Sequence, residues 1–182
     1  LCGLTLLSLT GCGAPKTETL DIFAMDTYMS LVAIGDGASD VLQACSNEIN
    51  TLEQRLSRTI ETSSVAQLNA NGIAQLDDDT AALLQAALQY SAETGGTFDV
   101  TIAPLVELWG ITGDDPRVPA QSEIDALLPL VGSEHVHLEG TAAALDEGCA
   151  IDLGGIAKGY ASDKTAELFA GSGISGGFVS LG

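Results

Sequence analysis

The chain has 182 residues, 46% of them hydrophobic, which is enough to fold around a core and argues against a disordered protein. Acidic residues outnumber basic ones by 25 to 6, giving a formal net charge of −19. This balance excludes the basic surface that nucleic acid requires and argues against electrostatic binding to an anionic membrane surface. It is typical of a well-solvated acidic surface, which can also attract divalent cations.

The N-terminal stretch "LCGLTLLSLTGC" predicts an export signal. It is far shorter than the roughly 20 apolar residues that a transmembrane helix needs. Its end, Leu9 to Cys12, resembles a bacterial lipobox, in which the signal is cut before a cysteine that then carries lipid. We expect residues 1–11 to be a signal-peptide remnant, 12–19 the lipidated Cys12 with a linker, and 20–182 a folded domain. An ordinary secretory signal or a short buried strand is the alternative.

The first half of the domain begins with strands and continues with helices. Residues 20–35 predict two strand segments, broken or bulged near Met25 to Thr27. Ser39 or Asp40 can cap a helix to about Leu56, and a short helix is expected at 64–69. The predicted core face of the first helix is Val41, Cys45, Ile49, Leu52 and Leu56.

Acidic residues begin a further helix at 77–79, and Gly95-Gly96 stop it. Residues 97–110 predict an extended entry and then a short helix carrying Trp109, and "SEIDALLPLV" has a capping-box pattern at Ser122 and Asp125. Next come two strands, "HVHLEG" and "AALDEGCAIDL", a helix at about 155–170 and a strand in "ISGGFVSLG". This mixed, non-alternating order predicts an α+β fold in which helices pack on a mixed or antiparallel sheet.

Cys45 and Cys149 are the cysteines that would remain in the exported domain. An oxidising compartment would permit a disulfide between them. Because Cys45 falls on the apolar face of its predicted helix, we expect both to be small buried hydrophobic residues. No cysteine or histidine spacing suggests zinc.

The stretch "IDLGGIAKGY", residues 151–160, combines an acid, two glycines and a rare lysine at a predicted helix start. Glycines let a ligand approach the backbone, and the first amides of a helix favour anions such as phosphate. Lys158 adds positive charge where the helix dipole does not favour it. The residues leave two interpretations open, which are a phosphate-ligand site and a local Asp152–Lys158 ion pair beside a tight turn.

Two other polar features stand out. Asp99 lies between Phe98 and Val100, and two interpretations are equally open, a buried functional acid and a turn or capping acid. His135 and His137 would share one face of a strand. Two histidines without a third ligand are more typical of a strand surface than of a metal site.

Several motifs together resemble the FAD:protein FMN transferase (ApbE) family, in the family's order along residues 20–182. They are "AMDTYMSL", "LEQRLSRTIETSSVAQLN", "TGGTFDVTIAPLVELWG", "IDLGGIAKGYASDK" and "GFVSLG". The resemblance implies an exported enzyme that uses FAD and Mg²⁺. It would cleave FAD, attach FMN through a phosphoester bond to a threonine or serine of a flavoprotein, and release AMP.

The resemblance also implies roles for individual residues. FAD would contact Met25, Thr59, Thr97, Phe98, Asp99, Asp152 and Lys158, and Gly155 would offer its carbonyl oxygen to Mg²⁺. Thr59 stands where the family usually has a tyrosine, and Asp26 where it has a glycine. The sequence itself does not identify a catalytic base.

The expected partners are target flavoprotein subunits of redox complexes, and the expected location is a bacterial membrane, through lipid on Cys12, on its extracytoplasmic face. The start at Leu1 and the end inside an apolar run suggest a fragment. In the family, acidic Mg²⁺ ligands follow this region, so we expect residues 1–182 alone not to transfer FMN. The alternatives are an FAD hydrolase, a non-catalytic flavin-binding or solute-binding lipoprotein, and a structural envelope lipoprotein.

Overall fold

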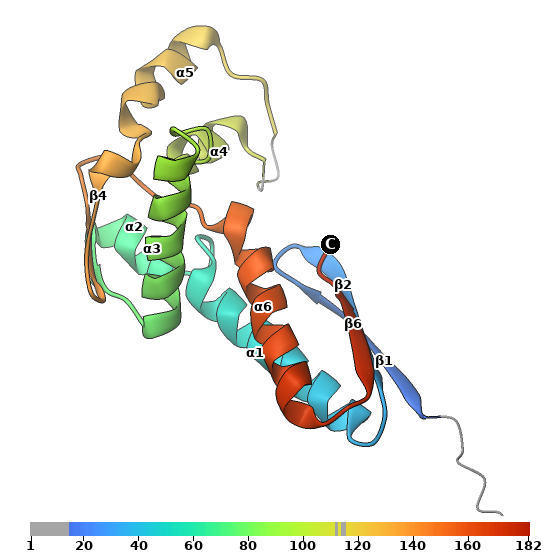
Figure 1. Ribbon diagram of the computed structural model, residues 1–182. Helices are drawn as coiled ribbons and strands as arrows, with labels where there is room; N and C mark the ends of the chain where they lie inside the picture. Colours follow the sequence, from blue (N-terminus) through green and yellow to red (C-terminus); the bar gives the residue numbers. More distant parts are fainter. Residues whose placement is uncertain (1–14, 112, 114–115) are drawn as a thin grey trace, which may run out of the picture.

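The computed structural model describes residues 15–111, 113 and 116–182 (Figure 1). The expected signal remnant and Cys12 lie outside these ranges. Two three-stranded antiparallel sheets, ordered β1-β2-β6 and β3-β5-β4, pack with helices and confirm the α+β prediction. No helix in the described part of the chain is long and apolar enough to cross a bilayer.

The first sheet joins the two ends of the described chain. It consists of β1 (Thr17–Ala24), β2 (Thr27–Ile34) and β6 (Gly176–Ser180). The long helices α1 (Ala38–Leu56) and α6 (Gly154–Ser172) lie side by side along this sheet (Figure 1). They run antiparallel, so that the end of α1 lies near the start of α6.

Apolar periodicity explains this layer. On β2, alternate residues Met29, Leu31 and Ala33 are buried, as a strand with one covered face requires. The predicted core face of α1 is confirmed, because all of its residues are buried. Burial of such side chains, worth about 1.5–3 kcal/mol each, holds the helix to the sheet.

The second sheet and the shorter helices form the other half of the fold (Figure 1). Its strands are β3 (Ile73–Gln75), β4 (Val136–Glu139) and β5 (Ala142–Leu145). The helices are α2 (Ser64–Asn71), α3 (Asp78–Glu93), α4 (Ala103–Trp109) and α5 (Gln121–Leu127), with 3₁₀ turns η1 (Leu128–Leu130) and η2 (Ser133–His135). The short strand β3 was not predicted, because three residues give too little alternation to detect.

Several predicted boundaries were wrong. β1 begins at Thr17, inside the expected linker, because its backbone pairs with β2 up to Ile34. Gly37 precedes α1 without a side-chain cap. At α5, the Glu123 carboxylate accepts from the Ala120 amide at 2.8 Å, so that the reciprocal cap expected at Ser122 and Asp125 does not form.

The entry to α4 is built from bends and turns, not from extended chain. The two cysteines agree with their prediction, since Cys45 and Cys149 are both buried and unpaired. Burial raises the pKa of the Cys45 thiol to about 11, as expected for a thiol in a hydrophobic core.

Candidate functional site

A pocket of about 490 Å³ opens where the β1–β2 turn, the end of α1, the following loop and the start of α6 meet. This volume is typical of a small-molecule site. It is lined by Met25, Asp26, Glu53, Leu56, Ser57, Arg58, Thr59, Ile60, Asp152, Gly154, Ala157 and Lys158. The fold therefore brings four predicted site residues together, which are Met25, Thr59, Asp152 and Lys158.

Asp152 fixes the start of α6. Its Oδ1 accepts from the Gly154 amide at 2.7 Å. A side chain at residue 154 would place its Cβ 3.0 Å from that oxygen, which explains the glycine. The segment before it is irregular and not a strand, contrary to the prediction. Asn69 holds its backbone instead, since the Asn69 side chain exchanges two 2.8 Å hydrogen bonds with the backbone of Ile151.

Asp152 pairs with Arg58, and the local Asp152–Lys158 ion pair is therefore not found. Arg58 Nε donates to Asp152 Oδ2 at 2.9 Å, and Arg58 Nη1 donates to Glu107 Oε1 at 3.4 Å. The Arg58 side chain is only 11% exposed, so these contacts are weakly screened by solvent. The role of Arg58 was not predicted from the sequence. Two features could have indicated it: Arg58 is one of only 6 basic residues, and it precedes Thr59, which was expected to line the site.

Among the residues that the structure describes, Lys158 is the cation of the pocket without an acidic partner. No acidic side chain of the described residues lies within 4.0 Å of its ammonium group. It is half-buried near the start of α6, where the helix dipole disfavours a cation. An anionic ligand group in this pocket would supply the missing charge.

The β1–β2 turn forms another wall of the pocket. Met25 and Asp26 have φ values of 49° and 57°, the left-handed conformation of a tight two-residue hairpin turn. The predicted break between the strands is thus confirmed and is a turn, not a bulge. This turn type favours glycine at the position of Asp26. The family motif also has glycine there, so the turn geometry explains the family's preference, and Asp26 departs from it.

The other predicted residues lie outside the pocket lining. Thr97 is exposed, and its hydroxyl donates to the Thr94 carbonyl at 2.9 Å. Phe98 packs beside the start of α6, where its Cε2 would lie 3.3 Å from a Cβ added to Gly155. The glycine at 155 therefore allows this approach.

Asp99 closes a turn before α4 and does not cap that helix, whose N-cap Ile102 has no side-chain cap. Its Oδ1 accepts from the Thr101 amide at 2.8 Å and from the Thr101 hydroxyl at 2.6 Å. Its Oδ2 accepts from the Ser91 hydroxyl at 3.2 Å. These bonds fix the turn that places Phe98 against α6.

The histidines bind a shared carboxylate. His135 Nδ1 and His137 Nε2 lie 2.9 and 2.8 Å from the two Asp146 oxygens, next to β5. The hydrogen bond that His135 makes to the Asp146 carboxylate raises the His135 pKa, and the hydrogen bonds accepted from the two histidines lower the Asp146 pKa. The described residues contain no group of three or more histidine, cysteine or acidic side chains arranged for a metal.

A polar network behind the pocket joins α1, α3 and α6. Asp79 Oδ1 accepts from the Tyr160 hydroxyl at 2.7 Å, and its Oδ2 accepts from Arg55 at 2.6 Å. Lys164 lies 3.4 Å from Asp79 and 5.1 Å from the centre of the Tyr160 ring. The Tyr160 hydrogen bond, followed by the charge of Lys164, lowers the Asp79 pKa.

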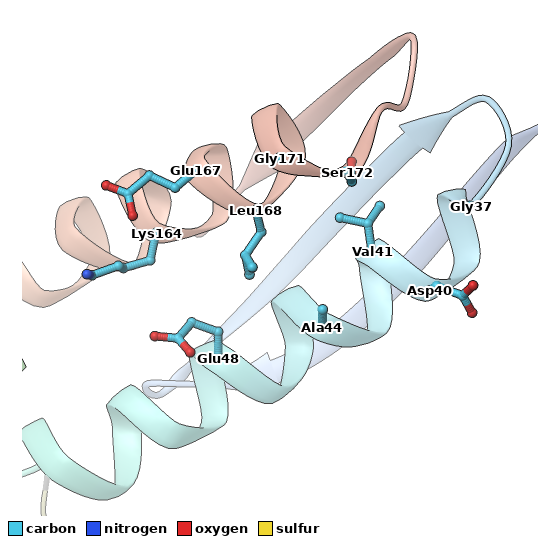
Figure 2. A pocket seen from close by; sticks show the side chains of 10 residues that line it. All are labelled: Gly37, Asp40, Val41, Ala44, Glu48, Lys164, Glu167, Leu168, Gly171 and Ser172. Carbon is cyan, nitrogen blue, oxygen red and sulfur yellow. The ribbon is translucent and has the colours of Figure 1, made fainter.

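A larger hollow of about 700 Å³ lies between the start of α1 and the end of α6, away from the predicted residues (Figure 2). Val41 and Leu168 point toward one another across it. Its lysine, Lys164, already contacts Asp79 and Tyr160. The pocket of about 490 Å³ is the better candidate site, because Lys158 and the predicted residues Met25, Thr59 and Asp152 line it together.

The fold and this pocket define an α+β domain with a small-molecule site suited to an anionic ligand. The chain belongs to the ApbE family, whose model matches residues 25–182. It is 28% identical to a Vibrio cholerae FAD:protein FMN transferase over 98% of this chain and 57% of that protein. It is 31% identical to one from Treponema pallidum, over 80% of this chain and 44% of that protein.

A solved structure gives the same assignment. The crystal structure of the ApbE protein from Thermotoga maritima matches with a TM-score of 0.85 and 30% identity, over 91% of this chain and 56% of that one. The chain thus spans about half the length of the relatives it matches.

The described residues do not by themselves fit a Mg²⁺ site. Mg²⁺ prefers six oxygen ligands in near-ideal octahedral geometry, commonly including carboxylates. Both Asp152 oxygens already have hydrogen-bond partners, and no three-carboxylate group is present in the described residues. The carbonyl oxygen of Gly155, at the start of α6, could therefore serve as a Mg²⁺ ligand only together with further oxygen ligands.

Proposed function

We propose that this chain forms the FAD-binding part of a Mg²⁺-dependent FAD:protein FMN transferase. The proposal rests on one observation above all. Four residues expected from the family motifs converge on one pocket, whose unpaired Lys158 offers a cation in a chain with a net charge of −19. A diphosphate-containing substrate such as FAD supplies the complementary negative charge.

In the proposed reaction, an acceptor threonine or serine oxygen attacks the FMN phosphorus of FAD. A P–O bond to the acceptor forms, the P–O bond to AMP breaks so that AMP leaves, and the hydroxyl proton passes to solvent. Such transfers depend mainly on positioning and charge stabilisation. Lys158 would stabilise the diphosphate, and the Asp152–Arg58 pair would hold the start of α6 in place. Mg²⁺ would neutralise phosphate charge once its ligand set is complete.

The proposed setting is the extracytoplasmic face of a bacterial membrane, with lipid on Cys12 as anchor. The acceptors would be flavoprotein subunits of redox complexes. The lipobox resemblance supports this location. Metabolic labelling with a radioactive fatty acid tests it: label on the protein that disappears in Cys12→Ser is expected, and label that persists in Cys12→Ser contradicts it.

A gel assay tests the transferase activity. The natural full-length protein is mixed with FAD, Mg²⁺ and an acceptor domain modified by the Vibrio cholerae relative. Covalent flavin fluorescence on the acceptor after denaturing electrophoresis is expected. Release of FMN and AMP without label would indicate an FAD hydrolase, and FAD bound but unchanged would indicate a flavin-binding protein.

A further inference from the structure

The turn between β1 and β2 has a conformation that its own sequence does not favour. Met25 and Asp26 are the non-glycine residues with positive φ in the described chain, at 49° and 57°. Side chains disfavour this left-handed region, and residues stay in it when surrounding contacts hold them there. The pairing of Ala24 with Thr27 holds the two ends of this turn, and a contact from outside the hairpin adds a further restraint.

Glu53 supplies that restraint from α1. The Met25 amide donates to Glu53 Oε1 at 2.7 Å, across 28 residues of sequence. A carboxylate acceptor makes this a charge-assisted hydrogen bond, stronger than one between neutral groups. Glu53 itself is fixed, because its neighbours Ile49, Leu52 and Leu56 anchor α1 in the core.

The same three residues, Met25, Asp26 and Glu53, line the pocket that contains Lys158. We infer that Glu53 is a positioning residue: through the Met25 amide it fixes the wall of the pocket that a bound flavin nucleotide contacts. The inference rests on the proposed function for the identity of that ligand. Without an acceptor oxygen on residue 53, the turn leaves its left-handed conformation and Met25 no longer presents a fixed surface. Ligand binding must then order the turn, which lowers the affinity.

The test compares FAD affinity, measured by flavin fluorescence, in Glu53→Ala, Glu53→Gln and the double variant Glu53→Ala with Asp26→Gly. Glu53→Ala removes the acceptor oxygen and should weaken binding about tenfold. Glutamine keeps an acceptor oxygen and should bind FAD within about threefold of the parent, since only the charge assistance is lost. Glycine adopts the left-handed conformation without a steric cost, so the double variant should regain most of the lost affinity. Glu48→Ala, on the same helix but outside the pocket, is the matched control.

Three results would overturn the inference: parent-like affinity in Glu53→Ala, an equal loss in Glu53→Gln, or no recovery in the double variant. If the parent protein binds no FAD, the proposed function fails, and hydrogen exchange of the Met25 amide then decides alone. Protection lost in Glu53→Ala and kept in Glu53→Gln supports the restraint. Unchanged protection in Glu53→Ala contradicts it.

Discussion

At the scale of single residues, Asp152 and Arg58 connect parts of the chain that are 94 residues apart. Asp152 binds the Gly154 amide with one oxygen and Arg58 with the other. Arg58 reaches Glu107 on α4 as well. This arrangement makes the pair a brace between the loop after α1 and the start of α6.

Removing the guanidinium should therefore be costly. Arg58→Ala leaves a partly buried carboxylate without its partner, and we expect a loss of about 1–3 kcal/mol in the free energy of unfolding. Urea denaturation measures it. Arg117→Ala is the control, because Arg117 pairs with Glu123 at 2.8 Å with both side chains at least 40% exposed. That exposed pair should contribute little, because solvent screens it, and equal losses in the two variants would contradict the brace.

Lys158 should matter for ligand binding and not for folding. We expect Lys158→Gln to weaken FAD binding roughly tenfold or more, since a charge-assisted contact to phosphate is lost, with an unchanged melting temperature. Isothermal titration and thermal unfolding measure the two effects. Lys164→Gln should do the reverse, because Lys164 contacts Asp79 and Tyr160 and lies outside the pocket. A drop in stability without loss of affinity in Lys158→Gln would refute this role.

At the level of secondary-structure elements, the open end of the β4–β5 hairpin is held by a hydrogen bond between His135, just before β4, and Asp146, just after β5. Asp146 raises the pKa of His135 above its usual 6.5 by hydrogen bonding to Nδ1. A histidine whose folded-state pKa is raised stabilises the fold below its unfolded pKa, and that contribution is lost as pH rises through the folded value.

An NMR titration should therefore give His135 a midpoint above 6.5 in the folded protein. In Asp146→Asn the midpoint should fall toward the ordinary value, because the carboxylate charge is gone. A midpoint that does not change in Asp146→Asn would show that the pair is not formed in solution.

The network around Asp79 has the opposite pH dependence. Because the Asp79 pKa is lowered, chiefly by Tyr160, its contribution is present above the unfolded pKa of about 4 and is lost as pH falls through the folded value. Asp79→Asn should thus be destabilised by about 1–3 kcal/mol at pH 7 relative to the parent. Urea denaturation at pH 7 and below pH 4 should show the difference shrinking with acid. A pH-independent difference would contradict the network.

The elements show where sequence reasoning succeeds. The spacing of Val41, Cys45 and Ile49 on α1 reports the core face directly, because a helix repeats every 3.6 residues. The segment before Asp152 was mistaken for a strand, since its hydrogen bonds go to Asn69 and Val100 and not to a neighbouring strand. A distant side chain, that of Asn69, and a distant backbone carbonyl, that of Val100, supply these partners, and local sequence patterns do not reveal them.

At the scale of the whole molecule, the candidate site is assembled from parts far apart in sequence. Residues 25–26, 53–60 and 152–158 meet in one pocket. The family resemblance predicted several of these residues, but chemistry alone predicted only an anion site around residues 152–158. Arg58, Glu53 and Asn69 were found in the structure because their roles depend on tertiary contacts. The chain spans about half the length of the relatives it matches.

The family resemblance implies that acidic Mg²⁺ ligands follow this region of the chain. We therefore expect that a protein consisting of residues 1–182 alone does not transfer FMN to an acceptor. Full flavinylation activity of that protein would contradict this expectation.

In the proposed reaction, FAD is cleaved and its FMN part is attached to another protein. The intact mass of an acceptor domain, measured after incubation with FAD, Mg²⁺ and the natural full-length protein, tests it most directly. If FMN is transferred, the acceptor gains the mass of FMN less one water, and AMP is released in equal amount. An acceptor of unchanged mass, with FAD either intact or hydrolysed to FMN and AMP, would contradict it.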